Sequence, residues 1–297
     1  MSVLLLDTGY VQAVLRLPAG LDATAARAAA RTLPGGWHLA PAGDGDGQGL
    51  PVVEVASGQP AVTCDGGTVR VSLPPQDAAS AGLAYVTYTA LERARQQQGK
   101  ATVHATTMVA PGGGAVLLLG DKGAGKTTTA LALAALGWAH AGDDLAVIGE
   151  DQGGQVTAWP GKPIAAVRDP AAPLAPKPLA GLEPFAAGPV PLRRVVRLAV
   201  RPGLAAGLSP AVPLQAGEAL RLHELLARYI SGLPTPLAGV GTGPGAVPYG
   251  PVWPLDTPQL AAWRSRLITA LAACQLSYLH APDAAAAAAL LNREVGR

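Results

Sequence analysis

The chain has 297 residues, of which 49% are hydrophobic and 14% are charged, and its formal net charge at pH 7 is +2. This length can bury a large core in one or two domains. The nearly neutral charge gives no reason to expect a nucleic acid partner. The only two cysteines, Cys64 and Cys274, show no metal-ligand spacing. We therefore expect neither a disulfide framework nor a zinc site, and a reducing, cytoplasmic location.

The sequence does not predict a membrane segment. The first residues, MSVLLLDTGY, lack the basic head and the small-residue cleavage site of a signal peptide. The apolar stretch 267–279 is interrupted by Thr269 and Gln275. It is also shorter than the ~20 residues that a membrane span needs. We expect a soluble protein without a membrane partner.

Residues 1–100 predict a small N-terminal α/β module. Apolar residues in alternating or short continuous runs indicate strands at 11–17, 52–55 and 68–73. An Ala-rich helix is expected at 23–32, and one long helix at 78–98. We find no residues suited to chemistry in this module and expect a structural or dimerising role. A homo-oligomer is therefore left open.

Residues 101–297 predict a second, larger domain. Two strands at 103–109 and 115–119 are expected to form a hairpin, followed by a helix at 127–136. A further hairpin is expected at 145–149 and 155–159. After this hairpin, we expect irregular Pro-rich chain at 160–191 and a strand at 194–200. A helix at 218–229 and a Gly/Pro-rich loop at 231–254 are expected next. The last expected elements are a helix at 258–273, a strand at 275–280 and a helix at 284–291.

The residues after the second strand match the phosphate-binding pattern G-x-x-x-x-G-K-[ST]. Glycines let the backbone turn so that successive N–H groups face one phosphate, and the following helix start adds its positive dipole end. Lys126 supplies a charge to the β and γ phosphates, and the Thr127 hydroxyl is placed to ligate Mg²⁺. The apolar strand before the loop and the helix after it are the context that this motif requires. The sequence therefore predicts that ATP and Mg²⁺ are cofactors, and that the nucleotide is bound by Gly120, Asp121, Lys122, Gly123, Ala124, Gly125, Lys126, Thr127 and Thr128.

Two neighbouring carboxylates, Asp143 and Asp144, follow the phosphate loop after one helix, one short strand and a turn. We expect them at a strand end beside the mouth of the loop. One carboxylate there can hold Mg²⁺ while the other accepts the proton of an attacking hydroxyl. The alternative is a polar hairpin turn without a catalytic role, and the neighbouring loop favours the functional interpretation.

His104 is a third candidate, on the strand expected at 103–109. If the hairpin pairs as expected, its side chain reaches the nucleotide or the acceptor. A single histidine on a strand is often structural, so the spacing alone leaves both interpretations open.

Basic residues are concentrated between residues 162 and 201, where seven of them stand against two acidic residues. Arginine suits a bidentate contact with a carboxylate or phosphate. Lys162 and Arg168, in the Pro-rich stretch, are candidate substrate-binding residues. We expect the strand arginines, Arg193, Arg194 and Arg197, to be solvated charges on a strand face.

Residues 103–149, VHATTMVAPGGGAVLLLGDKGAGKTTTALALAALGWAHAGDDLAVIG, resemble the catalytic core of the HPr kinase/phosphorylase family. That family shows a histidine, a hairpin, a Gly-rich loop with Lys-Ser/Thr, a helix and an Asp-Asp pair at these spacings. The resemblance implies an α/β fold with a P-loop kinase core of the HPr kinase/phosphoenolpyruvate carboxykinase type. It also implies that Asp144 is the base or acid at a serine hydroxyl and that His104 assists it. Lys126 and Thr127 would then bind phosphates and metal, with Asp143 as the second metal ligand.

The sequence also departs from that family. Thr128 stands where the family has a glutamate, and the stretch with a metal-associated glutamate is replaced by PGKPIAAVR at 160–168. The N-terminal module differs as well. The chain is therefore more similar to stand-alone relatives of the family, which include kinases of free serine and of peptides from natural-product clusters, lasso peptides among them.

These observations lead to one main hypothesis and two alternatives. The main hypothesis is an ATP- and Mg²⁺-dependent kinase that phosphorylates a hydroxyl, that of serine, on a small molecule or peptide. Asp144, His104 and Lys126 are its expected catalytic residues. The alternatives are a bifunctional HPr-type kinase/phosphorylase and a non-catalytic nucleotide-binding regulator.

Overall fold

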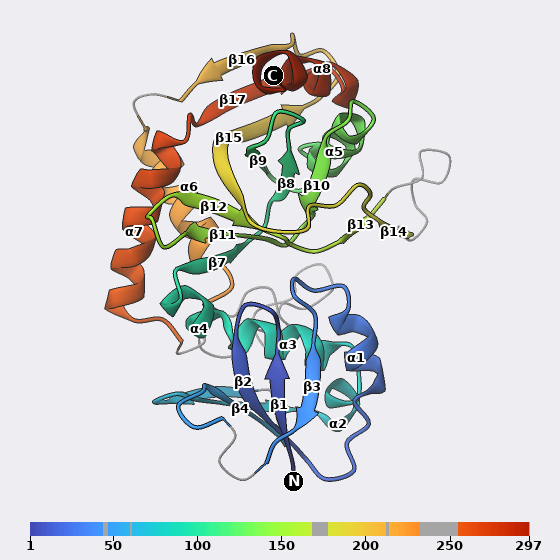
Figure 1. The fold of residues 1–297 in the computed structure, drawn as a ribbon, viewed down its shortest axis with the longest axis vertical. Coiled ribbons are helices and arrows are strands. Elements are labelled where there is room, and N and C mark those ends of the chain that lie inside the picture. Colours follow the sequence, from blue (N-terminus) through green and yellow to red (C-terminus); the bar gives the residue numbers. More distant parts are fainter. Residues whose placement is uncertain (44–46, 60, 168–177, 212–213, 232–254, 297) are drawn as a thin grey trace. The chain divides into compact units, whose positions relative to one another are not determined.

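A computed structural model describes residues 1–297 except 44–46, 60, 168–177, 212–213, 232–254 and 297. The described residues form a mixed α/β protein with two compact units (Figure 1). The first unit contains Met1–Ala101 and Leu226–Trp263, and the second contains Thr102–Leu225 and Arg264–Arg297. Compactness does not show that either part folds alone, so the division into domains 1–100 and 101–297 stays a prediction.

The first unit contains a six-stranded sheet with strand order β3-β1-β2-β4-β6-β5. β1 and β2 form an antiparallel hairpin, whereas β2, β4 and β6 run parallel to one another. The strands expected at 11–17, 52–55 and 68–73 are present as β2, β4 and β6. The bounds are β1 (Ser2–Asp7), β2 (Gln12–Leu17), β3 (His38–Pro41), β4 (Val52–Ser57), β5 (Ala61–Asp65) and β6 (Thr68–Leu73).

The helices of the first unit correct one expectation. The helix expected at 23–32 is α1 (Thr24–Ala30), but the single long helix expected at 78–98 is wrong. Three short helices occupy this region: α2 (Pro75–Ala78), α3 (Gly82–Ala90) and α4 (Glu92–Gln97). The Ser80 hydroxyl accepts a hydrogen bond from the Gly82 N–H and donates one to the carbonyl oxygen of Asp77. Such local side-chain bonds compete with helical ones, which explains the break before α3.

The strand β9 lies inside the main sheet of the second unit, and its five residues are all buried. β9 lies between β8, with which it forms the expected antiparallel hairpin, and β15, to which it is parallel. The order of the main path is β10-β8-β9-β15-β12-β11-β7, and β17 joins β15 and β16. The strand bounds are β7 (Lys100–Val103), β8 (Thr106–Val109), β9 (Ala115–Leu119), β10 (Ala139–Gly142), β11 (Ala146–Glu150), β12 (Val156–Trp159), β15 (Val190–Val200), β16 (Gly207–Pro210) and β17 (Ser277–Ala281).

The Pro-rich stretch expected to be irregular contains a small two-stranded sheet. Its strands, β13 (Ile164–Ala166) and β14 (Leu179–Gly181), pair antiparallel. The remaining helices are α5 (Lys126–Ala134), α6 (Ala216–Ala227), α7 (Pro258–Ala273) and α8 (Ala284–Val295). They correspond to the four helices expected in this part of the sequence.

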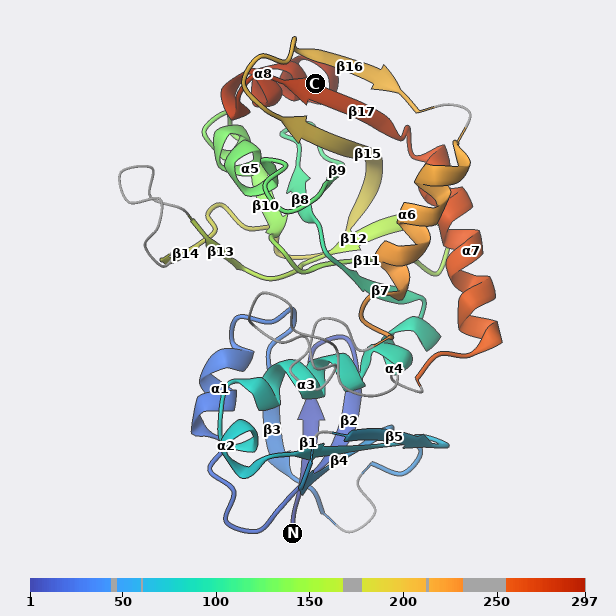
Figure 2. The same ribbon diagram turned by 180° about the vertical axis from the view of Figure 1, so that it is seen from behind.

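A hydrophobic core on one face of the β9–β15 sheet fixes the position of the phosphate loop. Val116 and Leu118 from β9 join Val196 and Leu198 from β15 in this core, together with apolar residues of α5 and α8. Since side chains alternate along a strand, Arg197 projects from the opposite face of β15. Seen from both sides, α5 and α6 lie on opposite sides of these strands (Figures 1 and 2).

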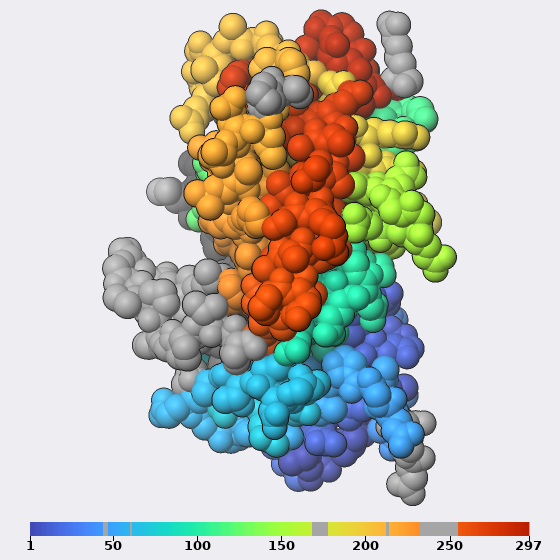
Figure 3. Space-filling model, turned by 90° about the vertical axis from the view of Figure 1, so that its left-hand side faces the viewer, coloured from blue at the N-terminus to red at the C-terminus, as the bar shows by residue number. Residues whose placement is uncertain are grey.

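Helix α7 runs along the surface beside α6 (Figure 3). Among the residues that the structure describes, no helix has both the length and the apolar character needed to cross a membrane.

Candidate nucleotide-binding and catalytic site

The phosphate loop lies between the end of β9 and the start of α5, pressed against the end of β15. A Cβ atom on Gly120 would lie 2.9 Å from the carbonyl oxygen of Leu198, and one on Gly125 would lie 2.8 Å from Cβ of Val200. The Val200 N–H donates a hydrogen bond to the carbonyl oxygen of Ala124. Gly125 also has a φ of +92°, which L side chains rarely adopt. The first and last glycine positions of the motif require glycine because the backbone there passes too close to β15 for any side chain.

The start of α5 is suited to bind an anion. Its N-cap residue is Gly125, and no side chain caps the helix with a hydrogen bond. The first N–H groups of a helix lack intrahelical partners, and the dipole makes this end positive. Most of the remaining loop is open to solvent: Asp121, Lys122, Gly123 and Thr128 are exposed, and Ala124 is half-buried.

Lys126 is almost completely buried, with 7% of its surface exposed. Its ammonium group donates hydrogen bonds to the carbonyl oxygens of Gly120, at 2.7 Å, and Asp121, at 3.3 Å. Burial lowers the pKa of Lys126, while the charges of Asp144 and Asp143 raise it. The ammonium is therefore held inside the loop, within the electrostatic influence of both aspartates.

Asp143 is buried and receives hydrogen bonds from two threonines. The Thr106 hydroxyl donates to Oδ1 at 2.5 Å, and the Thr127 hydroxyl lies 3.1 Å from both carboxylate oxygens. Burial raises the pKa of Asp143, and the bond from Thr106 partly offsets this. The structure thus brings Thr127 and Asp143, the two predicted metal ligands, into direct contact.

The donor set fits magnesium. A hydroxyl and a carboxylate are hard oxygen ligands, and Mg²⁺ in nucleotide sites is usually held by one or two carboxylates together with substrate phosphates. Within the described ranges, no group of three or more His, Cys, Asp or Glu side chains could hold a metal ion. A hydroxyl and one carboxylate leave most coordination positions to phosphates and water, so Thr127 and Asp143 are suited to a metal that arrives with a nucleotide.

Asp144 differs from its neighbour because its side chain is 43% exposed. Its φ of +60° is unusual for a residue with a side chain, and such backbone conformations concentrate at functional sites. The ammonium of Lys162 lies 3.8 Å from Oδ2 of Asp144. The exposed carboxylate is therefore available at the surface of the site and already faces a cation.

The backbone places Lys162 beside the two aspartates. The Lys162 N–H donates to the carbonyl oxygen of Leu145, and the Asp143 N–H donates to the carbonyl oxygen of Lys162. Gly142 and Gly161 touch each other: a Cβ atom on Gly142 would lie 2.8 Å from Cα of Gly161. This contact explains how a residue from the Pro-rich stretch reaches the Asp143–Asp144 turn.

The position of His104 corrects its predicted context. The strand expected at 103–109 is interrupted, and His104 is a half-buried residue between β7 and β8. It stands two residues before Thr106, the partner of Asp143. Its catalytic role stays a prediction, and Arg168 lies outside the described residues.

The strand arginines differ from one another. Arg194 donates to the Gln275 side chain at the surface, as expected for a solvated charge. The same expectation is wrong for Arg197, whose guanidinium is paired with the fully buried carboxylate of Glu218. Sequence reasoning missed Thr106 and Glu218. The hairpin pairing of Thr106 with Leu118, two residues before Gly120, is the signal that could have identified Thr106.

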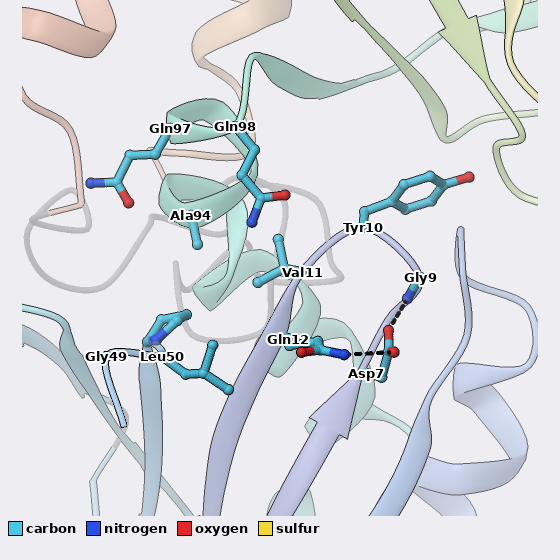
Figure 4. A pocket seen from close by; sticks show the side chains of 11 residues that line it. Asp7, Gly9, Tyr10, Val11, Gln12, Gly49, Leu50, Ala94, Gln97 and Gln98 are labelled. Carbon is cyan, nitrogen blue, oxygen red and sulfur yellow. Dashed lines mark hydrogen bonds between the residues drawn. The ribbon is translucent and has the colours of Figure 1, made fainter. Parts of the chain in front are cut away.

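The first unit has a cavity of about 560 Å³, formed by the start of β2, the start of β4 and the end of α4 (Figure 4). The carboxylate of Asp7 at its edge accepts hydrogen bonds from the Gly9 N–H, at 2.6 Å, and from the Gln12 side chain, at 3.2 Å. Asp7 is thus engaged within its own hairpin, and we assign no chemistry to this cavity.

No protein-family model matches the chain, and no curated protein matches it. Among the solved structures, it is similar to the HPr(Ser) kinase/phosphatase from Coxiella burnetii, with 18% sequence identity and a TM-score of 0.27. The match covers 38% of this chain and 72% of that protein. A TM-score of this size is too low to support an inference about activity.

Proposed function

We propose that this chain is an ATP-dependent kinase that transfers the γ-phosphoryl group to a hydroxyl, that of serine, on a small molecule or a peptide. The proposal rests mainly on one observation: a complete phosphate loop stands beside a buried aspartate and a half-exposed aspartate that faces a lysine. The resemblance of residues 103–149 to HPr kinases supports the same reaction class. Loss of the family's glutamate positions argues against the bifunctional kinase/phosphorylase.

The phosphate loop would hold the nucleotide. The backbone amides at the start of α5 bind phosphate oxygens, and Lys126 exchanges its contacts with the carbonyl oxygens of Gly120 and Asp121 for the β and γ phosphates. Because its ammonium is buried, its charge acts on the phosphates with little screening by water. Thr127 and Asp143 would hold Mg²⁺, which, when bound, neutralises charge on the phosphates.

Asp144 would accept the proton of the attacking hydroxyl. Its exposure lets an acceptor approach, and the nearby Lys162 ammonium favours one position of the carboxylate. Lys162 would orient Asp144 and attract an acceptor that carries a carboxylate or phosphate. His104 would assist at the same position. Positioning and charge neutralisation then supply most of the catalysis, as in other in-line phosphoryl transfers.

The ion pair between Asp144 and Lys162 favours one second candidate. In a nucleotide-binding regulator without transfer activity, this pair would keep the carboxylate occupied permanently. Such a protein would bind ATP but show no turnover that depends on an acceptor.

Incubation with γ-labelled ATP and a panel of free serine, amino alcohols and serine-containing peptides tests the proposal. We expect transfer to at least one serine hydroxyl, and a loss of nucleotide binding in Lys126→Ala. In Asp144→Asn the transfer rate should fall about 10²- to 10⁴-fold, the usual contribution of a general base, while ATP affinity stays unchanged.

Asp151→Asn is the matched control, because Asp151 is an exposed carboxylate in the turn between β11 and β12. It should leave the transfer rate unchanged. Transfer that is undiminished in Asp144→Asn would refute the proposed base. ATP binding without transfer to any acceptor would favour the regulator.

A further inference from the structure

The ion pair between Arg197 and Glu218 stands next to the phosphate loop. Arg197 is paired in register with Leu119, the residue immediately before Gly120. Its neighbours Val196 and Leu198 face the core under α5 and α8. Arg197 therefore projects from the other face of the sheet, at the strand end where the loop begins.

Glu218 holds the guanidinium firmly. Nε of Arg197 lies 2.8 Å from both carboxylate oxygens, and Nη2 donates to Oε1 as well. The carboxylate lies in the first turn of α6 and is fully buried, whereas 17% of the Arg197 side chain stays exposed. Arg221 lies 3.6 Å from the second oxygen of Glu218, but its own side chain is 62% exposed. Arg197 is thus the principal partner of the buried charge.

The pair leaves Arg197 with further capacity to bind. A guanidinium carries five N–H donors in a rigid fork, and Glu218 engages only the Nε side and one Nη group. Arg197 is also within electrostatic reach of the Lys126 ammonium, which hydrogen bonds hold inside the phosphate loop. A polyanion that binds within reach of both cations relieves the repulsion between them.

We propose that Arg197 is the second cation of this phosphate site and contacts the γ-phosphate of ATP, and that Glu218 is its positioning residue. This inference rests on the proposed nucleotide binding. Without this role, the Arg197–Glu218 ion pair would only hold α6 against β15. Nucleotides with a γ-phosphate should then bind more tightly than those without one, because only they reach Arg197.

The test compares the dissociation constants of ATP and ADP, measured by titration calorimetry, for wild type and Arg197→Gln. We expect ATP affinity to fall about 10- to 100-fold, the effect of losing a charge-assisted hydrogen bond, while ADP affinity changes little. Arg194→Gln is the matched control, since Arg194 lies on the same strand and bonds Gln275 at the surface. It should change neither constant.

Two further variants separate this role from a structural one. Arg197→Lys keeps a charge beside Glu218, so it should stay folded while losing most of the preference for ATP. Glu218→Gln should also lower ATP affinity, but by a smaller factor than the Arg197 variants do. Thermal melting identifies the variants that fold. Folded Arg197 variants that weaken ATP and ADP equally, or neither, would overturn the inference. Wild-type protein that binds neither nucleotide would instead refute the proposed function.

Discussion

Two clusters of charged side chains, one in each unit, differ in their burial and in how directly each charge is paired with an opposite charge. The Glu92–Arg95 cluster of the first unit consists of Glu92, Arg95, Gln96 and Tyr88. Both charged side chains are fully buried and form a salt bridge. The guanidinium stacks 3.7 Å from the centre of the Tyr88 ring and donates to the Tyr88 carbonyl oxygen. Gln96 donates to Glu92 and to the carbonyl oxygen of Leu226.

The Asp143–Asp144 cluster of the second unit, with Lys126 and Lys162, is matched less well. Burial raises the pKa of Asp143 and lowers that of Lys126, so each group is charged in surroundings that disfavour its charge. Asp144 and Lys162 are 3.8 Å apart and partly open to solvent. Charged groups arranged in this way are typical of sites that bind a ligand, whereas a closed salt bridge is typical of structure. The following predictions test this comparison.

The largest effect is expected in the Glu92–Arg95 cluster. Glu92→Gln leaves the buried Arg95 charge without its counter-ion, which should lower the free energy of unfolding by about 3–5 kcal/mol. Chemical denaturation measures this loss. Nucleotide affinity at native conditions should stay unchanged, because the cluster lies outside the phosphate site.

Glu54→Gln provides the control for Glu92→Gln. Glu54 pairs with Arg16 and Arg70 on the sheet of the same unit, with distances of 3.6 and 3.7 Å. Both arginines are exposed, so the loss should be about 1 kcal/mol or less. Equal losses in the two variants would contradict the structural role of the Glu92–Arg95 cluster.

A smaller loss is expected for Thr106→Val, which removes a hydroxyl donor from Asp143 at almost constant volume. A hydrogen bond to a charged group contributes about 1.5–3 kcal/mol, and the free energy of unfolding should fall by that amount. In an Asp143→Ala background, which has no acceptor for the Thr106 hydroxyl, most of this loss should disappear, and a double-mutant cycle measures the difference. A loss that persists there would show that Thr106 acts through packing alone.

The smallest effect has the opposite sign. The pKa of Asp143 is raised above its ordinary value of 3.8, so the folded protein binds this proton more tightly than the unfolded chain does. This tighter proton binding stabilises the folded state fully below pH 3.8. The stabilisation is lost as the pH rises through the raised pKa of Asp143. In metal-free buffer at neutral pH, Asp143→Asn should therefore be more stable than wild type by on the order of 1 kcal/mol.

Denaturation of both proteins at neutral pH and near pH 3.8 checks this prediction. The difference should shrink towards the lower pH, where the wild-type carboxyl is itself neutral. A variant that is less stable at neutral pH would show that the two threonine hydrogen bonds outweigh the cost of burial.

The sequence predicted much of the framework because apolar patterns are local. The buried run 115–119 and the helix 258–273 have the predicted bounds, since each is set by its own residues and by the Gly or Pro beside it. The helix expected at 78–98 failed at its start because Ser80 forms hydrogen bonds that a periodicity argument does not include. Leu91, with φ −86° and ψ 0°, then separates α3 from α4. The edge strand β16 has too little apolar content to be recognised.

For the site, the sequence supplied the residues that belong to a motif, and the fold supplied their partners. Lys126, Thr127 and Asp143 were identified from spacing, and the structure places them together. Glu218 could not be found, because its pairing with Arg197 depends on how α6 packs against β15. Lys162 was suggested only by local charge, and its contact with Asp144 depends on a distant backbone contact.

That backbone contact, between Gly142 and Gly161, has a consequence for mutational scanning. Even alanine at position 161 would put a methyl carbon 2.3 Å from the carbonyl oxygen of Leu145, so the two segments would have to separate. Lys162 and the aspartate turn would then move apart although neither had been changed. A saturation library selected for activity should therefore tolerate substitutions at these two glycines as poorly as at Asp144. A residue without a side chain would rank among the most sensitive positions of the protein solely because it sets the distance between two chain segments.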